Sequence, residues 1–423
     1  MLRKITIYFL WLWVFLIPWQ TRWIIVDPIL EGSAWEYGRL SLYAGDILFG
    51  IILILSFVFW IKTKKINSFL LWPLVLFALF VGWAWLSLIW ASTALVGMYF
   101  ALRLTQILLI FLIFVILKPK PSTILSSLVI GAAVQGIIAI AQFTLGWTPA
   151  FKWFGLASKS AWELGPGVVE TISGRWLRAY GSLPHPNILG GYLAAGLLGA
   201  IHLLLHVKKS NRWWLWPSLI IISQGLVLSF SRSAWLGFGV SALLLIIFAL
   251  KDRIVFKKLI LLLILVAIIF AFNFAILQDL FLSRLGSVGR LEAISITERE
   301  TQIEFAMRAI KLHYLGLGVG NYTHWLQRIY PLEPGYIYQP VHSHYLLIWA
   351  ELGWFGIISF VLSLLLLFRS KIKAKLEHKH APFIALLVCF LAIGVFDHYF
   401  WTSYSGILLF GITFSSILIN PQK

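Results

Sequence analysis

Residues 340–356 read Pro-Val-His-Ser-His-Tyr-Leu-Leu-Ile-Trp-Ala-Glu-Leu-Gly-Trp-Phe-Gly, and they join a long polar segment to an apolar one. Ser343 is a favourable helix N-cap, so we expect a helix to begin there. His342 and His344 lie at this helix start, and Glu351 lies inside the apolar run that follows. The stretch therefore places reactive side chains at the edge of an apolar helix.

Apolar runs of this kind occupy most of the chain. Of its 423 residues, 60% are hydrophobic and only 12% are charged, and a transmembrane helix needs about 20 apolar residues. We therefore predict an all-α polytopic membrane protein with about twelve transmembrane helices and one large, partly helical outward loop. The expected spans are about 5–19, 46–61, 69–90, 98–117, 123–145, 188–207, 214–230, 234–250, 259–277, 345–368, 383–400 and 402–419.

The basic residues indicate which side of the membrane each loop faces. With a cytoplasmic N-terminus, most of the 34 Lys and Arg residues fall on the cytoplasmic side, together with only Asp252 and Glu377 of the 16 acids. Lys and Arg resist translocation, so this asymmetry predicts that both termini are cytoplasmic. No small-residue cleavage site follows the first apolar run, so we expect the first helix to stay uncleaved. It also accounts for the formal charge of +18 without a nucleic-acid partner. The single Cys389 excludes a disulfide framework and a cysteine-based metal site.

The same orientation divides the chain into three parts. Residues 1–277 would form the first nine membrane helices with outward loops at 20–45 and 146–187, residues 278–344 one large outward loop, and residues 345–423 the last three helices. Trp, Tyr, Pro and Gly mixed with charges are typical of loops at an aromatic-rich membrane interface. The large loop is the polar segment with enough length to hold a reaction.

Three arginines in or beside these loops are candidates to bind an anion. Arg178 precedes residues 184–187, Pro-His-Pro-Asn, where Pro186 suits the first turn of a helix. Arg232 lies in Ser-Arg-Ser between two apolar runs, and Arg299 lies in the first turn of a helix expected in the large loop. A guanidinium stays charged and binds phosphate bidentately. Arg178 could instead lie in a turn and snorkel to water, and Arg232 could simply be the polar residue that a hairpin tip needs. For Arg103, inside the fourth span, a structural ion pair is the interpretation we favour.

Local signals describe the rest of the large loop. Residues 297–300, Thr-Glu-Arg-Glu, match a capping box, so we expect a helix to begin at Thr297. Apolar residues then recur at helical spacing from Ile303 to Tyr314, and this face is expected to pack on the membrane domain. Residues 316–321, Gly-Leu-Gly-Val-Gly-Asn, lack the strand–loop–helix context of a nucleotide fingerprint and are predicted to form a tight turn.

One imidazole of the His342 and His344 pair is a candidate general base. A histidine has an unperturbed pKa of about 6.5 and accepts a proton near neutral pH, although a histidine at a membrane edge is often only an interfacial residue. His344 and Glu351 share a helix face but are too far apart for contact, so Glu351 needs another partner to stay ionised. Gly353 and Gly356 would let a second helix approach closely.

Other chemistries find less support in the sequence. His313, His324, His342 and His344 lie in one loop but do not form a His-Glu-x-x-His ligand pair, so no metal and no other cofactor is predicted. The Gly-x-Ser-x-Gly elbow of a serine hydrolase does not occur. A transporter would place charged or broken helices near the middle of the membrane, whereas the polar residues here gather at its outer edge.

Taken in order, these motifs resemble those of the O-antigen ligase and O-antigen polymerase superfamily of bacterial envelope glycosyltransferases. The resemblance spans nearly the whole chain. It rests on residues 178–187 (Arg-Ala-Tyr-Gly-Ser-Leu-Pro-His-Pro-Asn), residues 231–233 (Ser-Arg-Ser), Arg299 with the turn at 316–321, residues 342–356, and residues 397–402 (Asp-His-Tyr-Phe-Trp-Thr).

The resemblance implies a glycosyltransferase-C-like protein that transfers a glycan, with inversion and without a metal, at the outer face of the cytoplasmic (inner) membrane. The donor would be a glycan on undecaprenyl pyrophosphate, and the acceptor a hydroxyl of a lipid, glycan or protein. His342 would serve as the base, and Arg232 and Arg299 would hold the pyrophosphate. The further residues it implies are Arg178 as a weaker third cation, and His344, Glu351, His185 and Asn187 as supporting groups.

The motifs do not name the acceptor, and several functions stay open. A ligase that completes lipopolysaccharide or another cell-surface polysaccharide, a capsule-type polysaccharide polymerase and a protein O-oligosaccharyltransferase share them. A polysaccharide flippase or another membrane transporter is the alternative from a different class. The acting imidazole, His342 or His344, also stays open.

Overall fold

The protein is described here from a computed structural model. It describes residues 1–66, 69–163, 165–172, 174–207, 212–285, 290–373 and 381–419. Several charges that the sequence assigns to the cytoplasmic side lie outside the described residues, namely Lys208, Lys209, Lys375, Glu377, Lys379 and Lys423.

Helices dominate these ranges. They are α1 (Leu2–Leu16), η1 (Glu36–Gly38), α2 (Ala44–Thr63), α3 (Leu71–Leu86), η2 (Ser87–Ile89), α4 (Ala94–Leu117), α5 (Pro121–Leu145), η3 (Lys152–Phe154), α6 (Pro186–His206), α7 (Leu215–Leu228), α8 (Arg232–Ala249), α9 (Arg253–Ile276), α10 (Gln278–Leu285), α11 (Arg290–Leu312), α12 (Tyr322–Ile329), α13 (His344–Lys373), α14 (Ala381–Gly394), α15 (Tyr399–Thr402) and α16 (Tyr404–Leu418).

The strands are short and lie in two of the loops. Each pairs with one antiparallel neighbour in the described part of the chain. The pairs are β1 (Arg22–Val26) with β4 (Leu40–Tyr43), β2 (Ile29–Leu30) with β3 (Ser33–Ala34), β5 (Trp147–Thr148) with β6 (Lys159–Ser160), and β7 (Val168–Thr171) with β8 (Gly174–Leu177).

The helices support the membrane architecture that the composition predicts. Among the described residues, 8 helical segments are long and apolar enough to cross a membrane: α2, α3 with η2, α4, α5, α6, α8, α9 and α13. Shorter apolar helices are α7, α14 and α16, and α1 covers most of the first predicted span. The polytopic helical fold is therefore supported, while the count of twelve spans stays a prediction.

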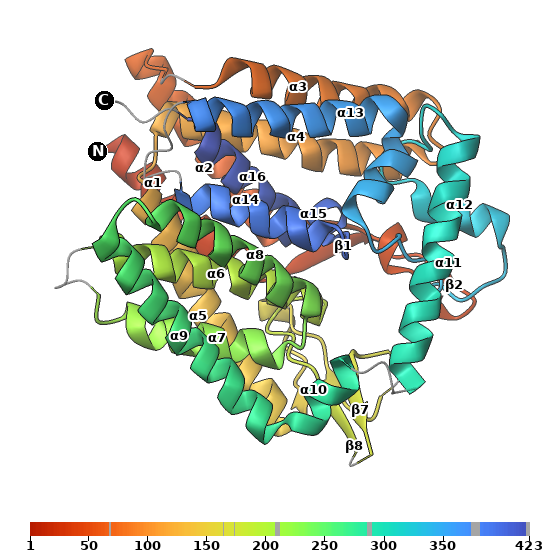
Figure 1. The fold of residues 1–423 in the computed structure, drawn as a ribbon. Helices are drawn as coiled ribbons and strands as arrows, with labels where there is room; N and C mark the ends of the chain where they lie inside the picture. The colour runs from red at the N-terminus through yellow and green to blue at the C-terminus, as the bar shows by residue number, and fades with distance from the viewer. Residues whose placement is uncertain are drawn as a thin grey trace.

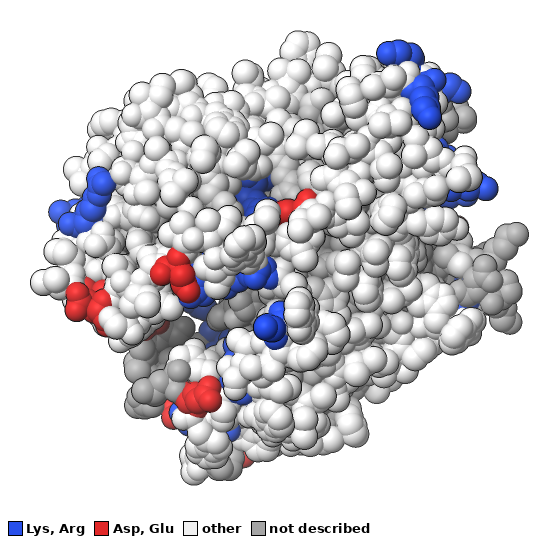
Figure 2. Space-filling model, turned by 180° about the vertical axis from the view of Figure 1, so that it is seen from behind, with Lys and Arg blue, Asp and Glu red and all other residues white. Residues whose placement is uncertain are grey.

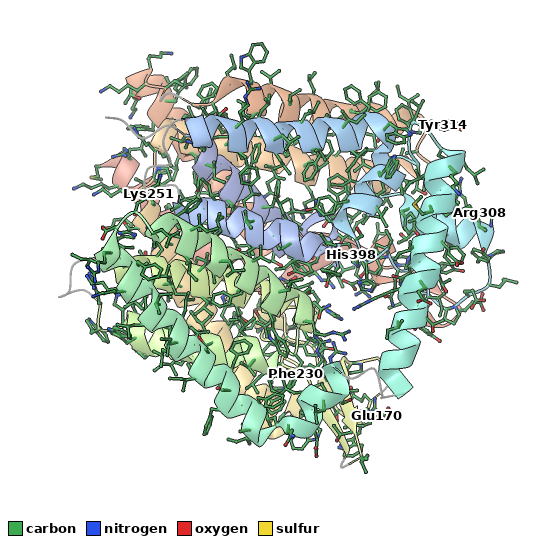
Figure 3. The ribbon with its side chains drawn as sticks, viewed as in Figure 1. Glu170, Phe230, Lys251, Arg308, Tyr314 and His398 are labelled. Atoms are coloured by element: carbon green, nitrogen blue, oxygen red, sulfur yellow. The ribbon has the colours of Figure 1, made fainter. Side chains whose placement is uncertain are left out.

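The long helices run side by side, and their two ends differ in character. Both termini lie at one end of the bundle, whereas α10, α11, α12 and the strands lie at the other, where α11 runs across the helix ends (Figure 1). We call this second end the loop end. Figure 3 places His398 toward the loop end and Lys251 near the termini. Residues far apart in the sequence therefore meet at the loop end.

The helix of the large loop begins earlier than its capping-box motif predicts, so that prediction is wrong. α11 starts at Arg290, and Thr297 lies inside it, where the Thr297 carbonyl accepts a bond from Thr301 Oγ1 at 3.0 Å. Only the middle of the expected apolar face is buried, at Ala306 and Ile310. At its two ends, Ile303 and Tyr314 are exposed, so α11 packs on α13 over a shorter stretch than the periodicity suggests.

Gly353 makes close contact with the Gly316 turn and not with a second helix, which corrects the helix-packing prediction. α13 is kinked at Gly353, where φ is +63°. A Cβ at Gly353 would lie 2.3 Å from the Tyr314 carbonyl oxygen, and one at Gly316 would lie 2.3 Å from that of Glu351. The two glycines thus let the turn and the kinked helix touch through their backbones.

Glu351 secures the same turn. Its Oε2 accepts bonds from Gly320 N and Trp401 Nε1, both at 2.7 Å. The sequence predicts that this buried acid has a partner, and in the structure two N–H groups donate hydrogen bonds to it. Glu351 therefore fixes the turn at 316–321 and α15 against α13, just below the segment that carries His342.

Candidate active site

A cavity of about 370 Å³ opens at the loop end and is lined by side chains from the helix ends and the outward loops. We call it the central cavity. Figure 2 shows Lys and Arg side chains in a recess on one face of the molecule, while most of the surrounding surface is uncharged. Of the candidate catalytic, anion-binding and supporting residues, those that line the central cavity are Arg178, His185, Asn187, Arg299 and His342, and Arg103 lines it too.

Arg178 is buried in the wall of the central cavity. Its Nε donates to the Ser229 carbonyl at 2.9 Å, and its Nη2 donates to Asn187 Oδ1 at 2.6 Å. Asn187 lies in the first turn of α6, after Pro186, and its backbone N donates to His185 Nδ1 at 3.1 Å. The imidazole of His185 therefore caps α6, and the helix start holds Arg178 in place.

Asn187 connects this wall to a buried carboxylate. Its Nδ2 donates to Asp397 Oδ2 at 2.7 Å, and the other oxygen of Asp397, Oδ1, accepts from the backbone N of His398 at 3.0 Å. The same Oδ1 lies 3.9 Å from His342 Nδ1. Burial opposes ionisation of Asp397, but the neighbouring His342 and His398 hold the pKa of its carboxyl group well below its usual range.

His342 and His344 differ in what they face. His342 lines the central cavity, and its side chain keeps 22% of its exposure. His344 is buried, its ring packs against Phe360 and Trp401, and its backbone N donates to the Asp397 carbonyl at 3.1 Å. Neither His344 nor Glu351 is among the residues that line the cavity. Of the two candidate imidazoles, only His342 lies where a substrate in the central cavity would contact it.

Arg232 lines an adjoining cavity, also of about 370 Å³, which we call the side cavity. The two cavities share Asn187, Arg284 and Arg299 in their walls. Arg232 lies at the start of α8, where its Nη1 donates to the Arg284 carbonyl at 2.7 Å. The remaining wall of the side cavity is mostly apolar and comes from Leu236, Ile296 and Phe396, all of them exposed.

The arginines raise the positive potential where the two cavities meet. Burial, together with the charges of Arg284 and Arg232, lowers the pKa of Arg178 to about 9. Arg178 therefore stays cationic at neutral pH, with two other guanidinium groups close enough to repel it. The carboxylates of Asp397 and Glu298, which also line the central cavity, offset only part of this charge, so the site suits a ligand with more than one negative charge.

One group of side chains has the spacing of metal ligands. The ligand atoms of His342, Asp397 and His398 lie within 4.8 Å of one another. Both oxygens of Asp397 already accept hydrogen bonds, from Asn187 and from the His398 backbone, and burial together with the charge of His342 lowers the pKa of His398 to about 3. The absence of a metal from the reaction stays a prediction.

Asp397 and Arg284 are among the cavity residues that were not identified as site residues from the sequence. Asp397 belongs to the motif at residues 397–402, and an acid between two apolar runs is a usable signal for a buried functional group. Arg284 lines both cavities, but it lies in the eight-residue helix α10, where no motif or periodicity distinguishes it from the other basic residues of the large loop.

Comparison with known proteins identifies part of this arrangement. Residues 217–361 match the model of the family described as O-antigen ligase. The matched region runs from α7 into α13, past the kink at Gly353, and contains Arg232, Arg299 and His342. No curated protein matches the chain. The match over residues 217–361 supports the resemblance to the O-antigen ligase and polymerase superfamily that the motifs indicate.

Proposed function

We propose that this protein is an O-antigen ligase-type glycosyltransferase, which moves a glycan from undecaprenyl pyrophosphate to an acceptor hydroxyl at the outer face of the cytoplasmic membrane. The observation that carries the proposal is the convergence at the central cavity. Arg178, Arg284 and Arg299 line it together with His342, and Arg232 lines the side cavity that opens from it.

The side cavity suits an amphiphilic donor. A lipid pyrophosphate needs cations at the headgroup and an apolar path for its chain. Arg232, Arg284 and Arg299 supply the cations, and Leu236, Ile296 and Phe396 provide the path. The start of α8 adds the favourable potential that a helix N-terminus offers to a phosphate.

His342 is assigned as the base toward the acceptor. Its Nδ1 lies on the side of Asp397, which leaves Nε2 to take the proton of an acceptor hydroxyl in the cavity. The new bond forms between that oxygen and the anomeric carbon, the bond from this carbon to the phosphate oxygen breaks on the opposite side, and undecaprenyl pyrophosphate leaves. A positioned base contributes about 10²–10⁴-fold.

Fixed guanidinium groups are assigned the larger part of the rate enhancement. Negative charge develops on the departing pyrophosphate, and preorganised cations in a site that excludes water stabilise it most effectively. Arginine provides them without a metal. The mechanism is therefore inverting and metal-independent in this proposal, with His344 and Glu351 acting through the packing of α13 rather than on the substrate.

The orientation of the chain follows from the same assignment. The loop end, with both cavities, would face the periplasm or the cell exterior, and the opposite end, with both termini and Lys251, would face the cytoplasm (Figures 1 and 3). This agrees with the positive-inside distribution of the sequence.

The proposal can be tested with the purified protein in liposomes, supplied with a glycan on undecaprenyl pyrophosphate and with candidate acceptors. We expect release of undecaprenyl pyrophosphate and a glycosylated product, in EDTA as in magnesium. Activity that EDTA abolishes and a divalent cation restores would contradict metal independence. In a deletion strain, long lipid-linked chains left unattached indicate a ligase, whereas single lipid-linked repeat units indicate a polymerase.

A further inference from the structure

A third cavity, of about 310 Å³, adjoins the central cavity on the side of the first outward loop. It shares Gln20, Arg22, Glu36, Arg39 and Pro184 with the central cavity, and we call it the outer groove. We propose that the outer groove binds an acidic sugar unit of the glycan, with Lys159 facing the negative substituent. The glycan nature of this ligand rests on the proposed function.

An ion-paired network builds the wall between the outer groove and the central cavity. Glu36 Oε1 accepts from Arg22 Nη2 at 2.9 Å, and Glu36 Oε2 accepts from Arg39 Nη1. Arg39 also pairs with Asp27 at 2.6 Å. Each carboxylate of this network is therefore already engaged by a guanidinium group. The wall is held by its own ion pairs and presents two arginines to both cavities.

Lys159 lines the outer groove from the second outward loop. It begins β6, which pairs with β5 so that Lys159 stands opposite Thr148. Its Nζ lies 4.5 Å from the centre of the Tyr180 ring, and Tyr180 is held by a hydrogen bond that its hydroxyl accepts from Gly167 N. Among the described residues, no Asp or Glu oxygen lies within salt-bridge distance of this ammonium group.

The charge balance of the outer groove therefore favours an anion. Arg22, Arg39 and Lys159 line it against the single carboxylate of Glu36, which the two arginines already share. Burial lowers the pKa of Lys159, and the charge of Glu36 offsets only part of this effect. An anion in contact with the ammonium group would offset more of the cost of burial. A neutral sugar would leave this cation without an anionic oxygen at salt-bridge distance among the described residues.

The size and position of the groove point to a small unit of a longer chain. Small-molecule sites occupy about 300–1,000 Å³, so the groove matches one or two sugar rings rather than a protein. The groove adjoins the central cavity, and Gln20 and Pro184 line both beside the ion-paired network. A glycan that begins at the reacting sugar would continue past these residues into the groove. The negative substituent is a carboxylate, as in a uronic acid, or a phosphate, since both offer anionic oxygens to an ammonium group.

Equilibrium binding to the full chain tests the assignment. We would use the His342→Ala variant in lipid nanodiscs, so that no transfer occurs, and titrate it with three disaccharides of one skeleton. One carries glucuronic acid, the second is its carboxyl-reduced, neutral counterpart, and the third carries a phosphate on the same carbon. We expect an acidic disaccharide to bind at least about tenfold more tightly than the neutral one, with a preference that weakens as salt rises. The preferred anion shows which substituent the groove takes.

Variants then separate Lys159 from general effects. Lys159→Met in the same background should abolish the preference, and Lys159→Arg should keep most of it. Lys152→Met is the matched control, because Lys152 lies in the same loop and over a Trp ring but does not line the groove, and this variant should bind like its parent. Equal binding of acidic and neutral disaccharides, or an unchanged preference in Lys159→Met, would overturn the proposal.

The failure of this inference and of the proposed function can be told apart. If the acidic disaccharide binds selectively but the wild-type protein releases no undecaprenyl pyrophosphate from a lipid-linked donor, the outer groove stands as an acidic-sugar site and the transferase proposal is rejected. If the wild-type protein transfers a glycan but shows no preference for the acidic disaccharide, the transferase proposal stands and the acidic-sugar site is rejected.

Discussion

The side-chain amide of Asn187 donates to the carboxylate of Asp397 at 2.7 Å, although 210 positions separate the two residues. This bond joins the start of α6 to the segment between α14 and α15. On one side it continues to Arg178, and on the other Asp397 lies beside His342. Asn187 and Asp397 both lie outside the region that matches the O-antigen ligase family. Parts of the chain beyond the family region therefore complete the site.

Replacing Asn187 with Ala should lower transfer without unfolding the protein. Arg178 and Asp397 would each lose a hydrogen bond and shift within the cavity wall, and a small misplacement of catalytic groups can cost about 10²-fold. We expect kcat to fall more than KM rises, measured with purified protein and a lipid-linked donor. Unchanged kcat in Asn187→Ala would show that the connection has no role in the reaction.

The two histidines at the start of α13 should respond differently to substitution. His342→Ala removes the only one of the pair that lines the central cavity, and transfer should fall by about 10²–10⁴-fold. His344→Phe replaces one buried planar ring with another against Phe360 and Trp401, and it should keep most of the activity. Initial rates of the two variants, compared at equal amounts of folded protein, check this. The opposite ranking would assign the chemistry to His344.

Arg284 should affect donor binding through its charge. It lines both cavities, and a buried or partly buried charge-assisted bond to an anion contributes about 1.5–3 kcal/mol. Arg284→Met should therefore raise the KM for the lipid-linked donor by at least about tenfold, while Arg284→Lys should lose less. Arg308→Met is the control, since Arg308 lies on α11 away from both cavities. Equal KM values in Arg284→Met and wild type would remove Arg284 from the donor site.

Gly353 should tolerate no side chain. Its φ of +63° disfavours residues other than glycine, and an added Cβ would lie 2.3 Å from the Tyr314 carbonyl oxygen. Gly353→Ala should therefore lower the free energy of unfolding by about 1–3 kcal/mol. Gly239→Ala is the matched control, because nothing lies within 4 Å of the corresponding Cβ. Thermal unfolding in detergent would measure both. A Gly353→Ala protein as stable as Gly239→Ala would show that the kink and the turn can move apart.

The ionised state of Asp397 should be visible in the pH dependence of stability. The pKa of this carboxyl group is held below its ordinary value in the folded protein, so ionised Asp397 contributes stability that is fully present above the unfolded pKa of about 3.9. That contribution is lost as the pH falls through the folded pKa. The unfolding temperatures of wild type and Asp397→Asn should differ constantly from about pH 5 to 8 and converge below about pH 4. A difference that grows on acidification would contradict the assignment.

Much of the fold can be predicted from local sequence patterns. Long apolar runs locate the membrane helices, Pro186 marks the start of α6, and Ser343 precedes α13 as a cap, with Ser343 Oγ accepting from Leu346 N at 3.5 Å. The ion pair expected for Arg103 is present, with Asp46 as its partner. The helices and their first residues depend on neighbouring residues in the sequence, and the ion pair of Arg103 follows from the cost of burying an unpaired charge. Both can be predicted from the sequence alone.

The site was harder to predict because it depends on contacts between distant segments. The motifs indicated Arg178, Arg299 and His342 separately, but the bond between Asn187 and Asp397 has no local signal. The capping box at Thr297 misplaced the start of α11, because a helix that already began at Arg290 overrides a local N-cap pattern. Arg22, Glu36 and Arg39 were not recognised either, since their roles arise only where the first outward loop meets the second.

The most direct test of the central claim is the fate of a labelled, lipid-linked glycan given to the reconstituted protein. We predict that undecaprenyl pyrophosphate is released and that the glycan appears on an acceptor with inverted configuration at its anomeric carbon, in EDTA, with the wild-type chain but not with His342→Ala. Recovery of the intact lipid-linked glycan on the opposite leaflet, with no release of undecaprenyl pyrophosphate, would contradict the account and identify a transporter.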